Sequence, residues 1–242
     1  MTTKAIILGA GMGKRMGADL PKVLHTICDK PMINILLDSV KQTGITDITV
    51  VIGPNMDNVK EAVSPIKTVT QVERLGTAHA VLAAESEIQP FEGNVLILFG
   101  DQPLFLPETL KRMVQKCEEG TDVAILGFIP EDPRRYGRLI MGENGLDAIV
   151  EYKDATDAQR DIKLCNSGVM CVNGKHLLHL LKEIDNKNVA GEYYLTDIVA
   201  KAKNKGLKRD VVIGDAAELH GVNTPEELEL AEEIYKKRMS QC

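Results

Sequence analysis

Short apolar runs alternate with amphipathic stretches along the first 130 residues of the chain. The short runs, which end at glycine or polar residues, predict buried strands, and the longer stretches with a helical period predict helices. Strands are expected at residues 4–8, 48–52, 67–72, 95–99 and 123–128, and helices at residues 31–41, 57–63, 77–85 and 107–117. Because strands that alternate with helices pair in parallel through right-handed crossovers, the sequence predicts an α/β fold with a three-layer, doubly wound, mainly parallel mixed sheet. Ligands of such sheets bind at the carboxyl ends of the strands.

The pattern changes after residue 130, where the expected strands become shorter and polar turns separate them. Strands are expected at 138–141, 148–152, 164–172 and 208–213, with helices at 175–183 and 196–204. We interpret residues 1–242 as one domain with a first part at about 1–130, a smaller lobe over the sheet edge at about 131–225, and a C-terminal helix at about 225–239. Thr224 is expected to cap this helix, with Pro225 in its first turn and Glu227 completing a capping box.

The charge, the cysteine pattern and the apolar runs of the sequence argue against a nucleic-acid-binding protein, a disulfide-rich protein and a membrane protein. A formal net charge of −6 leaves no overall basic field to hold a nucleic acid. The five cysteines are scattered, without a C-x-x-C pair, which favours a reduced protein. No apolar run approaches the roughly 20 residues of a membrane span, and the N-terminus does not read as a secretory leader. We expect a cytoplasmic protein that binds neither membrane nor nucleic acid, and its oligomeric state stays open.

A glycine-rich segment follows the first expected strand and reads Leu8-Gly9-Ala10-Gly11-Met12-Gly13-Lys14-Arg15-Met16. Three glycines in five residues allow backbone amides to approach a phosphate chain, and Lys14 and Arg15 add cationic donors. An oligophosphate site is the natural interpretation. A tight strand-to-helix turn with two solvated basic residues is the alternative, because glycine motifs by themselves are weak signals.

Two common phosphate-binding loops do not fit this segment. A Walker A loop requires Ser or Thr directly after Gly-Lys, and Lys14 is followed by Arg15. A dinucleotide-binding loop requires Gly or Ala at its sixth position, which is Lys14 here, and an acidic residue at the end of the second strand. That strand ends in Gly53-Pro54. The sequence therefore disfavours both a P-loop and nicotinamide binding.

Together with Leu20-Pro21-Lys22-Val23-Leu24-His25, the glycine segment resembles the signature of the sugar-1-phosphate nucleotidyltransferase family. The Pro-Lys-Val-Leu-His form is similar to the uridylyltransferase domain of the bacterial bifunctional N-acetylglucosamine-1-phosphate uridylyltransferase/acetyltransferases. Further similar stretches follow in the same order at residues 71–80, 99–104, 136–138, 151–156, 166–168, 191–197 and 221–223. The resemblance extends from Ile6 to about Tyr235, and it implies a Rossmann-like nucleotidyltransferase fold with a nucleotide-binding first part and a small sugar-binding lobe.

The resemblance implies a uridylyl transfer from UTP to N-acetylglucosamine 1-phosphate, which gives UDP-N-acetylglucosamine and pyrophosphate. A sugar-phosphate oxygen attacks the α-phosphorus, and pyrophosphate leaves in line. Because this nucleophile is already an anion at neutral pH, the reaction requires positioning and cations instead of a general base. Mg²⁺ is the expected cofactor, and the two small-molecule substrates are the expected partners.

The expected catalytic and metal-binding residues come from three parts of the chain. Asp101 follows the strand at 95–99, where either a ligand-facing carboxylate or a turn residue would suit the position. The resemblance makes Asp101 and Asn223 the metal ligands, in keeping with the preference of Mg²⁺ for one or two protein oxygens. It also implies that Arg15 pairs with the β- and γ-phosphates and that Lys22 reaches the α-phosphate or the sugar phosphate. By itself, a lysine after a proline is more often a solvated surface residue.

The remaining site residues are assigned by the resemblance to the nucleotide and to the sugar. The nucleotide residues are Leu8, Ala10, Gly11, Gly13, Gln71, Gly76 and Thr77. The sugar residues are Gly137, Glu151, Asn166, Tyr194 and Thr196. An amide such as that of Gln71 can pair with the uracil imide, and a carboxylate and an amide suit the hydroxyls of a sugar.

Several features depart from the family pattern. Gly9 stands where alanine is common and Lys14 where threonine is frequent, and both are compatible with phosphate binding. Phe99 occupies the place of a tyrosine beside Asp101, which removes a hydroxyl from the sugar pocket and leaves the identity of the sugar open. The bifunctional relatives continue into a left-handed β-helix of hexapeptide repeats. This sequence ends before that domain, so we expect no acetyltransferase activity unless the sequence is a piece of a longer chain.

Other functions compete with this interpretation. A different sugar phosphate is one alternative substrate, and a molybdopterin is another, because Arg15-Met16-Gly17 followed by Asp19 echoes the loop of molybdopterin nucleotidyltransferases. The stretch at 21–24 and the later sugar-lobe motifs argue against the molybdopterin. A non-catalytic sensor of sugar nucleotides would keep the fold and lose the metal, and the presence of both expected metal ligands disfavours it.

Overall fold

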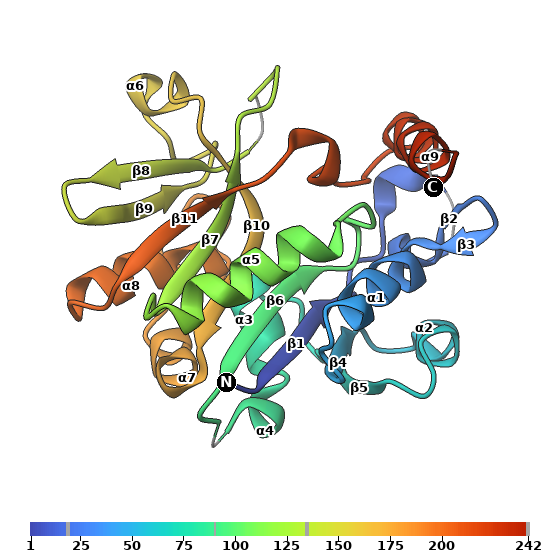
Figure 1. The fold of residues 1–242 in the computed structure, drawn as a ribbon, viewed down its shortest axis with the longest axis horizontal. Helices are drawn as coiled ribbons and strands as arrows, with labels where there is room; N and C mark the ends of the chain where they lie inside the picture. The colour runs from blue at the N-terminus through green and yellow to red at the C-terminus, as the bar shows by residue number, and fades with distance from the viewer. Residues whose placement is uncertain (18–19, 90, 134–135, 241–242) are drawn as a thin grey trace.

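A nine-stranded sheet forms the centre of the part of the chain that the computed structural model describes, which is residues 1–17, 20–89, 91–133 and 136–240 (Figure 1). Its main path runs β11 (Arg209–Ile213), β7 (Val123–Phe128), β10 (Cys165–Asn173), β6 (Asn94–Phe99), β1 (Thr3–Leu8), β4 (Asp47–Ile52) and β5 (Lys67–Thr70). β10 is antiparallel to β6 and β7, whereas the other neighbours on this path are parallel. The predicted mainly parallel α/β sheet is therefore confirmed.

Alternate residues of β1 face two different layers of helices. Ala5 and Ile7 belong to one core, and Ile6 and Leu8 belong to the other. The first core includes side chains of α1 (Met32–Gln42), α2 (Asp57–Ala62) and α5 (Pro107–Glu118). The second core includes side chains of α3 (Thr77–Leu82), α4 (Glu85–Ile88), α7 (Gly174–Lys182) and α8 (Ile198–Asn204). Burial on both faces explains why the strands read as continuous apolar runs. The helix expected at 77–85 is divided into α3 and α4.

The strand expected at 164–172 lies inside the main sheet and not in the smaller lobe, which corrects the prediction for that segment. β10 lies between β6 and β7, and β11 pairs with β7 at the sheet edge. The hairpin β8 (Arg138–Gly142) and β9 (Gly145–Val150) lies off the main path, next to α6 (Asp157–Arg160), at the upper left of Figure 1. A buried apolar run predicts a strand, but it does not identify the neighbours of that strand.

The C-terminal helix α9 (Pro225–Met239) packs beside the hairpin of β2 (Thr26–Ile27) and β3 (Lys30–Pro31), through a cluster that includes Val222, Ala231 and Ile27. Thr224 caps this helix as predicted, because its Oγ1 accepts from the Glu227 nitrogen at 3.3 Å. The predicted capping box is wrong in its second half. The Glu227 carboxylate accepts from the backbone nitrogen of Asn223, at 2.6 Å, and so reaches one residue beyond Thr224.

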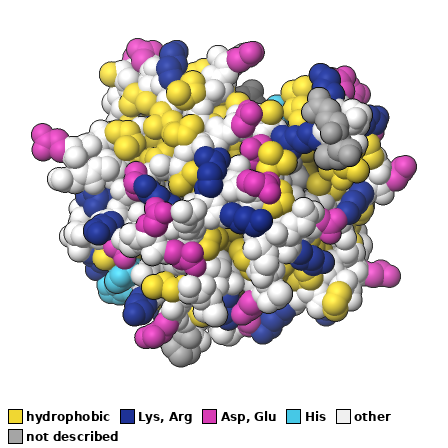
Figure 2. Space-filling view, viewed as in Figure 1, with side chains coloured by type: hydrophobic (Ala, Val, Ile, Leu, Met, Phe, Trp, Pro, Cys, Tyr) yellow, Lys and Arg dark blue, Asp and Glu magenta, His cyan; other side chains and the backbone are white. Residues whose placement is uncertain are grey.

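The surface of the molecule carries both signs of charge. Figure 2 shows basic and acidic side chains interspersed over one face, and the outline is notched between the β8–β9 part and the α9 part. Among the described residues, no helix has the length and apolar character required to cross a membrane. Cys28, Cys117, Cys165 and Cys171 are free thiols, whereas Cys242 lies outside the described residues.

Candidate active site

The glycine segment turns at the carboxyl end of β1, in the centre of the sheet. Gly13 has a φ of 65°, in the left-handed region that favours glycine, and it directly precedes a single 3₁₀ turn at Lys14–Met16. The backbone nitrogen of Lys22 donates to the carbonyl of Gly11 at 3.4 Å, so the segment after this turn folds back across the loop. The side chain of Lys14, predicted as a phosphate donor, lies outside what the structure describes.

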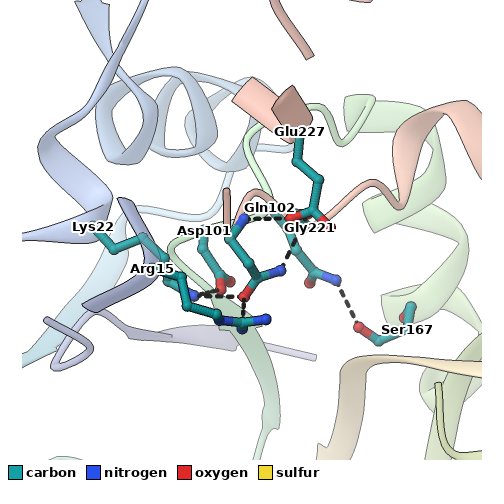
Figure 3. Close-up of polar contacts among 8 residues, drawn as sticks. Arg15, Lys22, Asp101, Gln102, Ser167, Gly221 and Glu227 are labelled. Atoms are coloured by element: carbon teal, nitrogen blue, oxygen red, sulfur yellow. Dashed lines mark hydrogen bonds and ion pairs between the residues drawn. The ribbon is translucent and has the colours of Figure 1, made fainter. Parts of the chain in front are cut away.

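Four side chains predicted as catalytic or metal-binding converge beside this loop, and Figure 3 labels three of them, Arg15, Lys22 and Asp101. The Lys22 ammonium forms an ion pair with Asp101 Oδ2 and donates to Asn223 Oδ1 at 3.1 Å. Arg15 Nη2 donates to the same Asn223 oxygen at 3.1 Å. Asp101 comes directly after β6 and Gly100, and Asn223 directly precedes the cap of α9. The structure thus brings together residues from the first, middle and last parts of the chain.

The Asp101 and Asn223 oxygens suit a divalent cation. Both accept from the single Lys22 ammonium, so one positive centre already lies within hydrogen-bonding distance of each. Hard oxygen donors of this kind are the ligands that Mg²⁺ prefers, with water and phosphate oxygens completing its coordination. No three His, Cys, Asp or Glu side chains cluster as a metal site anywhere in the described ranges. A metal here would therefore depend on one carboxylate, one amide and the substrate.

A backbone hydrogen bond joins the two segments that carry these oxygens. The Val222 nitrogen donates to the Asp101 carbonyl at 2.9 Å, immediately next to Asn223. Gln102 adds a second connection, since its buried side chain donates from Nε2 to the Ser167 carbonyl in β10 at 2.7 Å (Figure 3). Sequence reasoning did not select Gln102. Its place in the matching stretch at 99–104, directly after the predicted metal ligand, is the signal that could have found it.

The predicted nucleotide residues surround a cavity of about 260 Å³ at the glycine loop. Its walls include Leu8, Ala10, Gly11, Gln71, Gly76 and Thr77, together with Lys22 and Asp101. Gln71 is only 4% exposed, and its Nε2 donates to the Gly76 carbonyl at 3.2 Å and lies 3.3 Å from His79 Nδ1. Gly13, which was predicted to bind the nucleotide, does not line this cavity, and its left-handed backbone forms the turn before Lys14–Met16.

Arg74 is a residue of this cavity that sequence reasoning missed. Its Nε donates to the Ala10 carbonyl at 3.0 Å, and the side chain lines the same cavity as Gln71. The guanidinium thus orients one peptide group of the glycine loop. From the sequence, Arg74 reads as a solvated cation in a turn, although it lies within the matching stretch at 71–80.

The turn at Gly76 and Thr77 connects the smaller cavity to the chain segment that carries Tyr194 and Thr196, two of the residues predicted to bind the sugar. Thr77 Oγ1 accepts from the Leu195 nitrogen at 2.9 Å, and the Ala78 nitrogen donates to the Tyr193 carbonyl at 2.9 Å. Gly76 has a φ of 124°, and a Cβ there would lie 2.5 Å from the Tyr193 carbonyl oxygen. Only glycine allows the two segments to approach this closely.

A larger cavity of about 870 Å³ lies next to the first and contains most of the predicted sugar residues. Gly137, Glu151, Asn166 and Thr196 line it, and Tyr194 is not among its lining residues. Thr196 Oγ1 donates to Glu151 Oε1 at 3.2 Å, and Asn166 Oδ1 accepts from the Gly168 nitrogen at 3.0 Å. The wall of this cavity therefore presents a carboxylate and an amide, which can hold sugar hydroxyls.

Burial changes the acidity of two groups around this cavity. Burial raises the pKa of the Glu151 carboxyl, the Thr196 hydroxyl opposes the shift, and the Asp154 and Asp197 carboxylates add to it. Burial also raises the pKa of the Tyr194 phenol, and the carboxylates of Asp154 and Glu151 reinforce that shift. Tyr194 is therefore within electrostatic reach of Glu151 even though it does not line the cavity.

The two cavities share a wall made of Thr77, Phe99 and Asp101. Phe99 packs against the backbone of Gly168, where a Cβ would lie 2.9 Å from the ring carbon Cε2. A ring at this position separates the cavities without offering a hydroxyl to either. Asp101 and the cations beside it therefore lie where a group from one cavity would meet a group from the other.

The amino-acid sequence matches known proteins over most of its length. Residues 5–166 match the model of the family described as MobA-like NTP transferase domain. The chain is 49% identical over 239 residues to the bifunctional protein GlmU of Paramagnetospirillum magneticum and 52% identical over 239 residues to that of Rhodospirillum rubrum. These alignments cover 98% of this chain and 53% and 54% of the relatives, so the chain spans about half the length of the curated relatives it matches. The predicted resemblance to nucleotidyltransferases is confirmed.

Proposed function

Because the chain belongs to the family of MobA-like NTP transferase domains, we propose that it transfers the uridylyl group of UTP to N-acetylglucosamine 1-phosphate with the help of Mg²⁺. The products are UDP-N-acetylglucosamine and pyrophosphate. The resemblance of the sequence motifs to the uridylyltransferase domain of bifunctional enzymes supports this choice of substrates. The similarity to bifunctional GlmU proteins over 98% of the chain points the same way.

One observation carries the proposal. Arg15, Lys22, Asp101 and Asn223 meet at the boundary of two adjoining cavities. The smaller cavity has the glycine loop and a buried amide in its wall, which suits a nucleotide, and the larger one has a carboxylate and an amide for sugar hydroxyls. A triphosphate and a sugar phosphate in these cavities would bring their phosphates together beside the two cations.

The chemical step is an in-line displacement at the α-phosphorus. An oxygen of the sugar phosphate forms the new P–O bond, and the bond from the α-phosphorus to the oxygen that bridges to the β-phosphorus breaks. Pyrophosphate leaves with that electron pair. Lys22 neutralises the approaching phosphates, and Arg15 neutralises the charge that accumulates on the leaving group. Because the nucleophile is anionic, no side chain has to remove a proton.

Asp101 and Asn223 would hold the metal, which supplies positive charge to the phosphate oxygens when it is bound. The Lys22 ammonium now contacts both of these oxygens. When the metal and the substrates bind, the Asp101 and Asn223 oxygens would contact the metal. We therefore expect the Lys22 ammonium to turn from these oxygens toward phosphate. Its side chain is mostly buried, so only a short movement is available to it.

The test is a pyrophosphate-release assay over a grid of nucleoside triphosphates and sugar 1-phosphates, with Mg²⁺ present or chelated. We expect turnover with UTP and N-acetylglucosamine 1-phosphate, and its loss on chelation. Asp101→Asn should reduce turnover by at least roughly 10³-fold without lowering the melting temperature. Asp157→Asn, at a fully exposed carboxylate of α6, is the control and should leave turnover unchanged.

Other outcomes of the same grid would contradict the proposal. Turnover with GTP or CTP and a pterin phosphate would make the chain a molybdopterin nucleotidyltransferase. Turnover with a different sugar 1-phosphate would keep the reaction and change the acceptor. Binding of UDP-sugars without turnover under any condition would make the chain a sensor.

A further inference from the structure

The side chain of Asn223 is held by contacts that settle which way its amide points. Its Oδ1 accepts from the cations of Arg15 and Lys22, and its Nδ2 donates to the Gly221 carbonyl at 3.3 Å. The amide oxygen therefore faces the charged centre of the site and the amide nitrogen faces its own chain. These contacts orient the amide group, but the position of the residue depends on its backbone.

The backbone of Asn223 is held by Glu227, in the first turn of α9. Glu227, labelled in Figure 3, accepts through Oε2 from the Asn223 nitrogen at 2.6 Å. The Glu227 nitrogen donates in turn to Thr224 Oγ1 at 3.3 Å, so this carboxylate extends from the first turn of a capped helix. α9 contributes Ala231 to a buried cluster with Met32 and Leu104, and this packing fixes the helix relative to the sheet.

Helix capping alone does not explain this arrangement. Thr224 already provides the cap, and a glutamate at this helix position would ordinarily return to the backbone nitrogen of the cap residue itself. Here the carboxylate reaches past Thr224 to the residue that we propose as a metal ligand. Glu227 also lines the larger cavity, beside Asn223 and Gly221. The Glu227 carboxylate thus contacts the backbone of Asn223 and also lies at the wall of the larger cavity.

We infer that Glu227 is a positioning residue of the metal site, which holds Asn223 so that its amide oxygen and the Asp101 carboxylate bind one divalent cation. This inference rests on the proposed function. A carboxylate behind a ligand restricts the orientations of that ligand, so less ordering is required when the cation binds. Groups that act in this way are typically worth a factor of about 10 to 100 in metal affinity.

Two substitutions separate the reach of the side chain from its charge. Glu227→Asp keeps the negative charge at the helix start and shortens the side chain by one methylene, so it should lose the bond to the Asn223 nitrogen. Glu227→Gln removes the charge and keeps an oxygen at the same distance. Glu226→Asp is the matched control, because Glu226 is the preceding glutamate of the same turn, whereas the bond to the Asn223 nitrogen comes from Glu227.

The readout is the affinity for Mn²⁺, measured from the electron paramagnetic resonance signal of free Mn²⁺ in the presence of UTP and without the sugar phosphate. We expect Glu227→Asp to weaken Mn²⁺ binding by roughly tenfold. Glu227→Gln and Glu226→Asp should remain within about twofold of the unmodified protein. Circular dichroism melts of the three variants report whether α9 stays in place.

A double-mutant cycle with Asn223→Ala completes the test. If Glu227 acts through Asn223, Glu227→Asp should have no further effect on Mn²⁺ affinity once the amide is gone. Equal Mn²⁺ affinities for Glu227→Asp and the unmodified protein would overturn the inference, as would a loss of equal size in the Asn223→Ala background. Failure of the unmodified protein to bind Mn²⁺ with UTP would instead contradict the proposed function.

Discussion

A Cβ atom placed on Gly13 would lie only 2.8 Å from the Cβ of Lys22. The glycine loop and the segment that carries Lys22, the proposed catalytic lysine, are therefore in direct contact. Gly13 also has a φ of 65°, so two independent constraints favour glycine at this position. The position of the Lys22 ammonium between Asp101 and Asn223 depends on this close packing.

Gly13→Ala should therefore damage the site more than the fold. The substitution costs about 1–2 kcal/mol of backbone strain, and the new methyl group pushes Lys22 away from its partners. Gly17→Ala is the matched control, because Gly17 has a φ of 71° and a Cβ added there would meet no atom of the described residues within 4 Å. We expect similar losses of melting temperature and a turnover loss of roughly 100-fold for Gly13→Ala alone. Equal turnover losses in both variants would contradict this account.

Lys22→Met should change metal binding and catalysis in opposite directions. The Lys22 ammonium occupies the oxygens that we assign to the metal, so its removal leaves Asp101 without this cation and Asn223 Oδ1 with Arg15 alone. In the absence of nucleotide we expect Mn²⁺ to bind roughly tenfold more tightly, as measured by calorimetry. Turnover should fall by at least roughly 100-fold, because a phosphate partner is lost. Weaker Mn²⁺ binding by Lys22→Met would show that the lysine supports the metal instead of competing with it.

Glu151→Gln should stabilise the protein at neutral pH and weaken sugar binding. The pKa of Glu151 is raised above the ordinary value of 4.5 by burial, so the folded state holds this proton more tightly than the unfolded chain. Stability is therefore lost as pH rises from 4.5 through the raised pKa. We expect a higher melting temperature for Glu151→Gln at pH 7, and a gain that disappears below about pH 4.

The affinity of Glu151→Gln for the sugar phosphate should fall by roughly 10- to 100-fold, since a charged hydrogen bond is lost. Glu143→Gln, at an exposed position of the β8–β9 hairpin, is the control for both measurements. A stability gain of the same size at about pH 4 and pH 7 would rule out the burial of charge as its cause.

Gln71 should select uracil over cytosine. Its amide nitrogen donates to the Gly76 carbonyl, and its oxygen accepts from no donor among the residues that the structure describes. That oxygen can accept from N3–H of uracil, whereas N3 of cytosine carries no hydrogen. Gln71→Leu should lower kcat/KM for UTP by roughly 100-fold and change that for CTP by less than about threefold. A uniform loss with both nucleotides would indicate a general packing defect.

Local patterns were sufficient to predict most elements of the fold. The continuous apolar runs at 4–8, 95–99 and 123–128 became central strands, because both faces of the sheet are covered by helices. Thr224 and Pro225 marked the start of α9 correctly, since a cap is a local interaction. The place of β10 between β6 and β7 was not predictable in this way. Strand order depends on contacts between distant segments.

In the candidate site, too, the sequence predicted part of the result, and contacts between distant segments determined the rest. Its residue types and order along the chain carried the family resemblance, and that resemblance selected Arg15, Lys22, Asp101 and Asn223 without any coordinates. Arg74 was not selected, and Glu227 was predicted only as half of a capping box, because an arginine in a turn and a glutamate at a helix start both have ordinary local explanations. Their contacts to Ala10 and Asn223 exist only in the folded chain.

By itself, the sequence determined that this protein is an α/β nucleotidyltransferase with a glycine loop after its first strand, because periodicity, turn residues and motifs are properties of short segments. Tertiary structure alone decided that Lys22 and Asn223, 201 positions apart, share a hydrogen bond at the boundary of two cavities. The physical reason is that the sheet brings the carboxyl ends of its strands to one edge. Packing of α9 then fixes which side chains meet there.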